Sequence, residues 1–492
     1  MGEATPGQAP VRRRRWPRRL LKGFLLFLLV IVLLLVGFDI VWRYVGAKHL
    51  AAAVDEATRQ DPNWRWDDLQ ASRVKVADGD NAALQINRIA EHLPASWPQE
   101  GSPLRRLAPR SPSVAIEPND VRELRDQLNE LAPALTEAHA LTRFPSGRFP
   151  AAGAVESFAS TQDHLKRVQS VANLLRYEAL LLAEDGKVSE AVVSARTILH
   201  AGRALGDEPG SMAMLVRLAC RGQGIRGAER ALAQGEASDA VLAATRKLMD
   251  EEDSTDLLTP ALRGERAQVF EVYEYLEAGD LERLTGGKDN VGIEYSKTTF
   301  GQAELWLKVP WFRENRAQSL EWATREVENA LLPETERLAA FERLDQEAKR
   351  RHTNAFDHYR WYLASLFLGA HRAMAKASLR THAELRCASA GLAAERYRLV
   401  RGKWPDSLDA LVPAYLPAVP ADPFTGEPMH LRRLEDGLVI YSVGADKKDH
   451  GGNLEHLSEE TYGHADYGFR LWDVKYRRQA PPPGEQNSGE DR

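Results

Sequence analysis

Residues 397–452, YRLVRGKWPDSLDALVPAYLPAVPADPFTGEPMHLRRLEDGLVIYSVGADKKDHGG, decide the architecture of the C-terminal part of the chain. Gly402 ends a helix-forming stretch, and Trp404-Pro405 opens a segment with one short helix and four prolines that enforce an extended path. Two alternating runs, 429–433 and 438–442, flank Glu435-Asp436-Gly437 and predict a β-hairpin. With a third strand expected over 469–475, the sequence predicts a small α+β module.

Six short motifs follow one another in and after this stretch, and their order resembles the C-terminal domain of the major pseudopilins of type II secretion. They are Tyr397, Gly402-Lys403-Trp404-Pro405, LDALVPAYL at 408–416, PADPF at 420–424, SVGAD at 442–446 and HADYG at 464–468. The whole chain also resembles bacterial membrane-anchored proteins that carry this ending after a helical domain.

The resemblance to pseudopilins implies a calcium site in the loop after the hairpin. Carried over residue by residue, the ligands are the carboxylates of Asp446 and Asp466 and the backbone carbonyl of Val443, with Asp449 as a fourth candidate. The Gly- and Asp-rich composition of this loop suits oxygen ligands for a hard cation. A hydrogen-bonded turn without metal, with Lys447 and Lys448 beside it, is the alternative.

The N-terminal residues predict a membrane anchor at 23–42. Apolar residues and glycines fill positions 23–38, and the run resumes after Asp39, which gives about 20 residues and enough length to cross a bilayer. Residues 1–22 form a basic leader: the first 43 residues carry a net charge of +6, the remainder −11, and the whole chain −5. The positive-inside rule therefore predicts a cytoplasmic N-terminus and a periplasmic body on a single-pass inner-membrane protein.

Three other interpretations of this segment were weighed. A secretory signal cleaved near Val45-Gly46-Ala47 has suitable small residues, Arg18-Arg19 resembles a twin-arginine signal, and Lys22-Gly23-Phe24 resembles a prepilin-peptidase site. Pilin-type precursors carry a glutamate where this chain has Leu28. We expect an uncleaved signal anchor, and the acidic remainder argues against nucleic acid as a partner.

The body of the chain, residues 48–354, has a helical pattern with loops near 94–118 and 144–153. A long helix over 355–401 leads into the β module, so that 355–479 form one unit, and 480–492 have the composition of a disordered tail. Residues 186–199 and 235–248 are weak copies of each other and predict helical hairpins of the tetratricopeptide type, with Gly186 and Gly235 ending one helix and Ser189 and Ser238 capping the next. Such hairpins bind a partner protein or simply pack as antiparallel helices.

The motifs of the common catalytic classes are absent from the sequence. Gly222, Gly224 and Gly227 match a dinucleotide fingerprint but precede a helix instead of a second strand, so we expect close helix packing and no nucleotide. The spacing of four histidines (His352, His358, His371 and His382) does not suit metal binding on one helix face, and the acid pairs Glu251–Asp253 and Glu326–Glu328 are expected on solvated faces. The two cysteines, Cys220 and Cys387, are either buried thiols or one long-range disulfide.

The sequence as a whole favours a mainly α protein with one N-terminal transmembrane helix, a multi-helix hairpin ectodomain and a small α+β pseudopilin-like module. The leading hypothesis is a non-catalytic scaffold or assembly protein of the bacterial cell envelope, bound to the membrane through 23–42 and to a protein partner. The alternatives are a cell-envelope hydrolase with an unrecognised active site, and an accessory component of a type II secretion-like apparatus.

Overall fold

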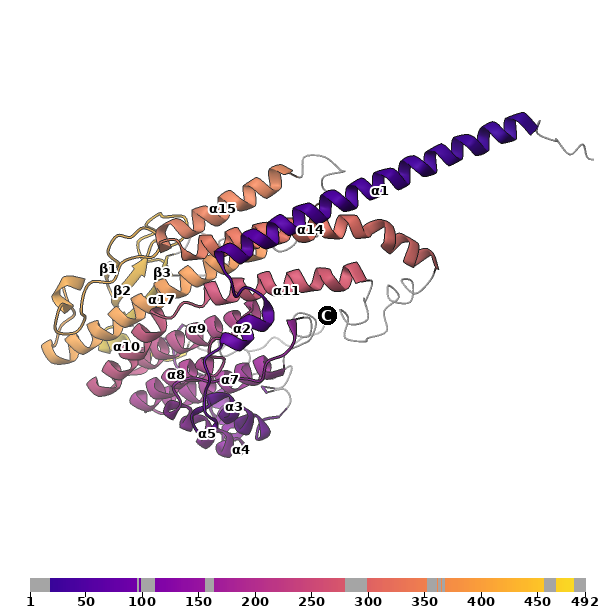
Figure 1. Cartoon of the computed structure of the whole chain (residues 1–492). Coiled ribbons are helices and arrows are strands. Elements are labelled where there is room, and N and C mark those ends of the chain that lie inside the picture. The colour runs from indigo at the N-terminus through magenta and orange to yellow at the C-terminus, as the bar shows by residue number, and fades with distance from the viewer. Residues whose placement is uncertain are drawn as a thin grey trace, which may run out of the picture.

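The computed structural model describes residues 18–94, 97–98, 111–154, 163–278, 299–351, 361, 364, 368–454 and 466–481, and within them the chain is mainly helical with one small sheet. This confirms the predicted class (Figure 1). The helices are α1 (Arg18–Gln60), α2 (Trp66–Ser72), α3 (Ala82–Glu91), α4 (Pro118–Glu130), α5 (Ala132–His139), α7 (Asp163–Glu184), α8 (Val188–Arg203), α9 (Ser211–Gln234), α10 (Asp239–Asp253), α11 (Leu258–Ala278), α14 (Thr299–Leu331), α15 (Glu334–Arg351) and α17 (Leu368–Arg401). The strands are β1 (His430–Leu434), β2 (Gly437–Ser442) and β3 (Tyr467–Trp472), and short 3₁₀ turns cover Asp78–Asp80, Ala140–Arg143, Leu408–Leu411 and Val474–Tyr476.

Helix α1 has two halves with different surroundings. Its first half is apolar and exposed, and it projects from the body in Figure 1; it is the one helix of the described residues long and apolar enough to cross a membrane. Its second half is packed, with Ala53 and Ala57 buried against Ala317 and Leu320 of α14 and Phe270 of α11. The predicted N-terminal apolar helix is confirmed, and its position near the N-terminus suits either an anchor or a signal sequence.

Helix α14 runs beside α1 in the same direction. Trp42 lies against Trp311 with ring centroids 5.4 Å apart, and further along the pair His49 Nε2 lies 2.8 Å from a carboxylate oxygen of Glu321. Trp322 of α14 is buried. These contacts hold the second half of α1 against the body over several helical turns.

The hairpins predicted from the internal repeat form as α7–α8 and α9–α10. Gly186 ends the first helix with a φ of +75°, which only glycine adopts readily, and Gly235 follows the last residue of α9. The capping prediction for Ser189 is wrong: the N-cap of α8 is Lys187, two residues earlier. Ser189 Oγ instead accepts a hydrogen bond from the backbone N–H of Ser238, the N-cap residue of α10 (2.9 Å).

The glycines of the fingerprint-like motif bring α8 and α9 close together. A Cβ on Gly227 would lie 2.9 Å from the Cβ of Ala195, and one on Gly224 would lie 3.0 Å from the carbonyl oxygen of that same residue. The motif lies inside α9 and is followed by α10, so the predicted role of these glycines in helix packing is confirmed.

The C-terminal sheet has the order β1-β2-β3, with both pairs antiparallel. Residues 437–442 of the central strand are buried throughout, and the hairpin and the helix end at Gly402 (φ +69°) lie where the sequence predicts them. The third strand begins and ends earlier than the predicted 469–475, at Tyr467–Trp472, and a 3₁₀ turn covers Val474–Tyr476. Phe469 of β3 packs on α17 at Gly391, where a Cβ would overlap the Cδ1 ring carbon. The sheet and the hairpins share one hydrophobic core, whose central helix is α17.

The segment after β3 ties the sheet to the hairpins. Arg477 donates to Glu395 of α17 (2.9 Å) and to the carbonyl of Gly235 (2.6 Å), and the next backbone N–H groups donate to Ala233 and Ser113. In Figure 1 the sheet lies at the end of the body away from the projecting half of α1.

Replacing Gly391 by valine tests how tightly the sheet packs on α17. We expect Gly391→Val to lower the free energy of unfolding by about 1–3 kcal/mol, the usual cost of overpacking, because Phe469 has to move. Gly79→Val is the matched control, since a Cβ there meets nothing within 4 Å. Chemical denaturation measures both variants, and equal effects would contradict close packing at this position.

Candidate functional site

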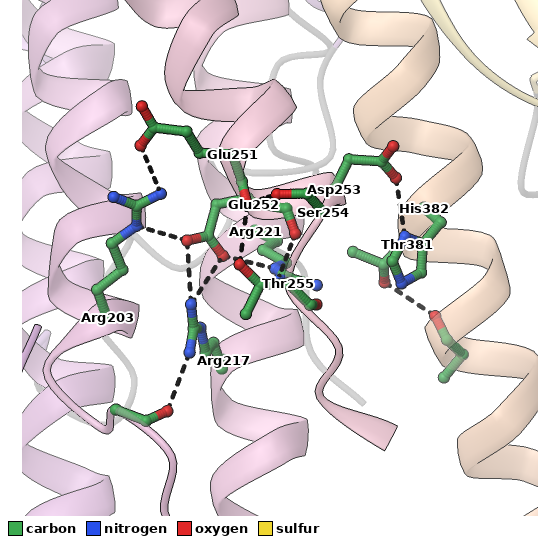
Figure 2. Close-up of polar contacts among 12 residues, drawn as sticks. Arg203, Arg217, Arg221, Glu251, Glu252, Asp253, Ser254, Thr255, Thr381 and His382 are labelled. Carbon is green, nitrogen blue, oxygen red and sulfur yellow. Dashed lines mark hydrogen bonds and ion pairs between the residues drawn. The ribbon is translucent and has the colours of Figure 1, made fainter. Parts of the chain in front are cut away.

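Three arginines converge on one buried carboxylate, Glu252, in the last turn of α10. Arg203 of α8 donates from Nε (2.6 Å), and from α9 Arg217 donates from Nη2 (3.1 Å) and Arg221 from Nε (2.7 Å). Figure 2 shows the three guanidinium groups around the carboxylate, of which only 1% is exposed. The arrangement joins three helices at a single charge.

The ionisation of Glu252 follows from these neighbours. Burial by itself would raise the pKa of this carboxyl, but the charges of Arg217, Arg221 and Arg203 outweigh burial and lower it to about 2. Arg221 also donates to the backbone carbonyl of Glu252 (2.6 Å), which satisfies an acceptor at the end of α10. The group is therefore a permanent anion that fixes the positions of its partners.

The acid pairs that the sequence assigns to solvated faces are only partly so. Glu251 is exposed and accepts a hydrogen bond from Arg203 (3.0 Å), whereas Asp253 accepts from His382 (2.8 Å) and Arg386 (2.9 Å) of α17. Glu326 is buried, which corrects the prediction for that residue, and lies 2.6 Å from Nδ1 of His371. The partners of Asp253 and Glu326 lie on other helices, so the sequence pattern of a single helix cannot predict them.

His371 and His382 lie within hydrogen-bond distance of Glu326 and Asp253, whereas His352 and His358 lie outside the described residues. The alternative left open for the cysteines is decided in favour of thiols, since Cys220 and Cys387 are both buried and unpaired with each other. Burial raises the pKa of Cys220 to about 12, so it is an inert thiol.

A cavity of about 470 Å³ adjoins the arginine cluster. Its wall is built from five segments: two loops near 74–76 and 145–147, residues 203–208 at and after the end of α8, the first turns of α9, and residues 251–260 from the end of α10 to the first turn of α11. Arg203, Arg217 and Glu251 lie on this wall, so one side of the charged cluster faces the space. The full lining is Val74, Val76, Pro145, Ser146, Gly147, Arg203, Leu205, Gly206, Asp207, Glu208, Ala213, Met214, Arg217, Glu251, Thr255, Asp256, Leu257 and Pro260.

Sequence reasoning missed both the cluster and the cavity. One local signal exists: Arg217 and Arg221 are four residues apart, hence on one helix face, within a stretch whose neighbouring positions are buried. Two arginines on the buried face of a helix need an anion from elsewhere in the fold. Their partner lies 31 and 35 residues away, and nothing local identifies it.

The residues predicted to bind calcium lie together around the loop that follows β2. Asp446 lies 3.0 Å from Nε2 of His450 and accepts from the backbone N–H of Lys448 (3.1 Å), and Asp449 accepts from Tyr441 (3.0 Å) and Gly451 (2.7 Å). Val443 donates its N–H to Asp422 (3.0 Å).

Asp466 differs from the other carboxylates of this loop. It is fully buried, it accepts from the backbone N–H groups of His450 (3.3 Å) and Gly452 (2.7 Å), and burial raises its pKa. Within the described ranges no three His, Cys, Asp or Glu side chains are grouped as a metal site, and residues 455–465, which precede Asp466, lie outside those ranges.

Searches of protein families, of curated proteins and of solved structures found no match for this chain. The resemblance to pseudopilins therefore remains a prediction from motifs.

Glu252→Gln tests the arginine cluster. We expect this variant to lose about 3–5 kcal/mol of unfolding free energy, because three buried arginines lose their counter-charge. Glu251→Gln, which changes the adjacent and exposed residue, should cost about 0–1 kcal/mol. Urea denaturation at neutral pH measures both, and a similar cost for the two variants would contradict the central role of Glu252.

The lowered pKa of Glu252 also determines how the stability of the protein changes with pH. Because the pKa of Glu252 is lowered from 4.5 to about 2 on folding, the stability that it contributes is complete above pH 4.5 and is lost as the pH falls toward 2. The stability difference between wild type and Glu252→Gln should therefore shrink through this window, whereas the difference for Glu251→Gln should stay small throughout.

Proposed function

We propose that this chain is a membrane-anchored scaffold of the bacterial cell envelope, facing outward from the inner membrane, that assembles with a protein partner and catalyses no reaction. The observation that carries the proposal is the continuity of α1. One helix of 43 residues contains an exposed apolar half, long enough to cross a bilayer, and a second half buried in the body. Because the helix is continuous, a bilayer around its apolar half would hold the folded body at a fixed position relative to the membrane.

The junction after α1 supports a rigid connection. Asp61, just after the helix, accepts two hydrogen bonds from Arg263 of α11 (2.7 and 2.8 Å) and one from the buried Arg266. Together with the Trp42–Trp311 contact, these bonds hold α1 at both ends of its packed half. A body held at a fixed height and orientation above a bilayer suits assembly with a partner better than a body on a flexible tether.

The cavity favours a second candidate, a hydrolase acting on an envelope polymer, because four carboxylates line it: Asp207, Glu208, Glu251 and Asp256. Each of them accepts a hydrogen bond from an arginine, a histidine or a backbone N–H group. Carboxylates held in this way are suited to binding a charge more than to transferring a proton, which is why the scaffold stands first.

The orientation of the chain can be tested with single cysteines, because both native cysteines are buried and should not react. In spheroplasts, a membrane-impermeant maleimide should label Ser407→Cys, at an exposed position near the sheet, and should leave Ala4→Cys in the leader unlabelled until the membrane is opened. Labelling of the leader cysteine alone in closed spheroplasts would contradict the outward orientation, and recovery of the body in the soluble fraction would contradict the anchor.

The pseudopilin-like ending supports a further part of the proposal, that calcium stabilises the loop at 443–453 and that the chain is an accessory component of a secretion-like apparatus. The buried Asp466 fits this, because it has backbone donors but no arginine or lysine partner within the described residues, and a buried carboxylate is costly without a counter-charge. Asp446 and Asp466 would hold the ion, with Val443 and Asp449 beside them; the ion would supply the missing positive charge.

Thermal melting of the full chain tests the calcium site. If the dissociation constant is about a hundredth of the free calcium concentration, binding adds about 2.7 kcal/mol of stability. Millimolar calcium should then raise the melting temperature, chelator should reverse the rise, and Asp446→Asn should abolish it. Identical melting with calcium and with chelator would leave the loop as a plain hydrogen-bonded turn.

A further inference from the structure

The cavity beside the arginine cluster has a preformed wall. The backbone N–H of Gly147 donates to the carbonyl of Arg203 (3.1 Å), and Arg148 donates to carbonyls of Gln70 (3.1 Å) and Arg73 (2.8 Å). At Gly147 a Cβ would overlap the backbone of Ala204, so the two loops approach as closely as glycine allows. A cavity of about 470 Å³ with such walls lies in the size range of sites for small organic ligands.

The charges on the wall favour a cation. Four carboxylates and two arginines line the space. With Glu252, Arg73 and Arg221, which are bonded to these groups, they make five carboxylates and four arginines, a net charge of −1 when His164 is counted as neutral. Asp207 is committed to Arg73 (3.2 Å) and to the backbone N–H of Val74 (2.8 Å). The net charge of these groups is therefore negative.

Glu208 is the carboxylate with an unused acceptor. Its Oε1 lies 2.8 Å from Nε2 of His164, whereas its Oε2 is buried and has no hydrogen-bond partner among the residues that the structure describes. The side chain is only 10% exposed, so solvent hardly reaches it. A buried carboxylate oxygen without a donor is costly, and a donor supplied by a ligand would remove that cost.

The remaining wall is apolar and includes Val76, Ala213, Met214 and Leu257. Met214 and Leu257 are buried members of one hydrophobic cluster at the start of α9 and α11. Aliphatic carbon entering the cavity would lie against these side chains and lose contact with water. The same space thus combines an acceptor for a positive charge with a surface for a hydrocarbon group.

We propose that this cavity binds a small organic cation, a protonated primary amine that carries a branched aliphatic group. The ammonium group donates to Oε2 of Glu208, and the aliphatic group packs on Met214 and Leu257. This site is separate from the anchor and from the loop at 443–453, so it stands or falls independently of the proposed scaffold function.

Three probes that share the branched side chain of leucine test the proposal on the full chain in nanodiscs by ligand-observed NMR. Leucinamide is a cation, N-acetylleucinamide is neutral and N-acetylleucine is an anion. We expect leucinamide to bind at least about tenfold more tightly than either relative, because a hydrogen bond to a charged group is worth about 1.5–3 kcal/mol. Equal binding of the charged and neutral probes, or no binding of leucinamide at millimolar concentration, would overturn the proposal.

Two variants and one control locate the binding. Glu208→Gln should weaken leucinamide binding by about tenfold or more while sparing the neutral probe. Val76→Trp fills the cavity from a loop without changing charge and should abolish binding of leucinamide, which keeps the test decisive if Glu208→Gln folds poorly. Glu190→Gln removes an exposed acid from the first turn of α8, outside the lining, and should bind as wild type. Unchanged affinity in Glu208→Gln or in Val76→Trp would place the probe elsewhere.

Discussion

The burial of α17 on all sides is the constraint on which the rest of the fold depends. From Leu379 to Ala394 nearly every side chain is buried, with α10 and α9 on some faces and β2 and β3 on another. A helix surrounded in this way needs small residues, because two layers must approach it at once. Alanines supply most of them, and Gly391 accepts the ring of Phe469 where even a methyl group would not fit. The sheet could not pack on the hairpins without this narrow helix.

Buried charges set the register of the helices around that core. Asp253 accepts from two side chains of α17, Glu395 of α17 accepts from Arg477, and Glu252 holds three arginines from two other helices. Such pairs add little net stability over apolar packing, but breaking one is costly, so a helix shifted by a turn would leave charges unpaired. The apolar core permits many registers of alanine-rich helices, and the ion pairs select one of them.

Local patterns predict the parts of this fold that depend on local physics. The N-terminal apolar helix is visible as an apolar run, the β-hairpin as alternation around Glu435-Asp436-Gly437, and the close packing of α8 on α9 as Gly224 and Gly227 in one helix. Apart from the misplaced cap at Ser189, which is local, the failures concern partners that are remote in the sequence. Glu326 meets a histidine 45 residues away, and Glu252 meets arginines from two other helices.

The cavity could not be predicted for the same reason, since five separate segments form its wall. The glutamate that we consider central to it, Glu208, follows a turn with no recognisable motif. The only trace of the site in the sequence is the pair Arg217 and Arg221, which are charged residues on a face that is otherwise buried. Such a pair indicates that a buried anion lies nearby, but it does not identify the residue that supplies the anion.

A continuous set of contacts links the N-terminal apolar helix α1 to the cavity. The chain leaves α1 at Asp61, which is held by Arg263 and Arg266 of α11, and the first turn of α11 forms part of the cavity wall. Beyond α2 the same segment reaches Arg73 and Val74, which hold Asp207 on that wall. The segments that form the cavity wall therefore also make the contacts that join the packed half of α1 to the body.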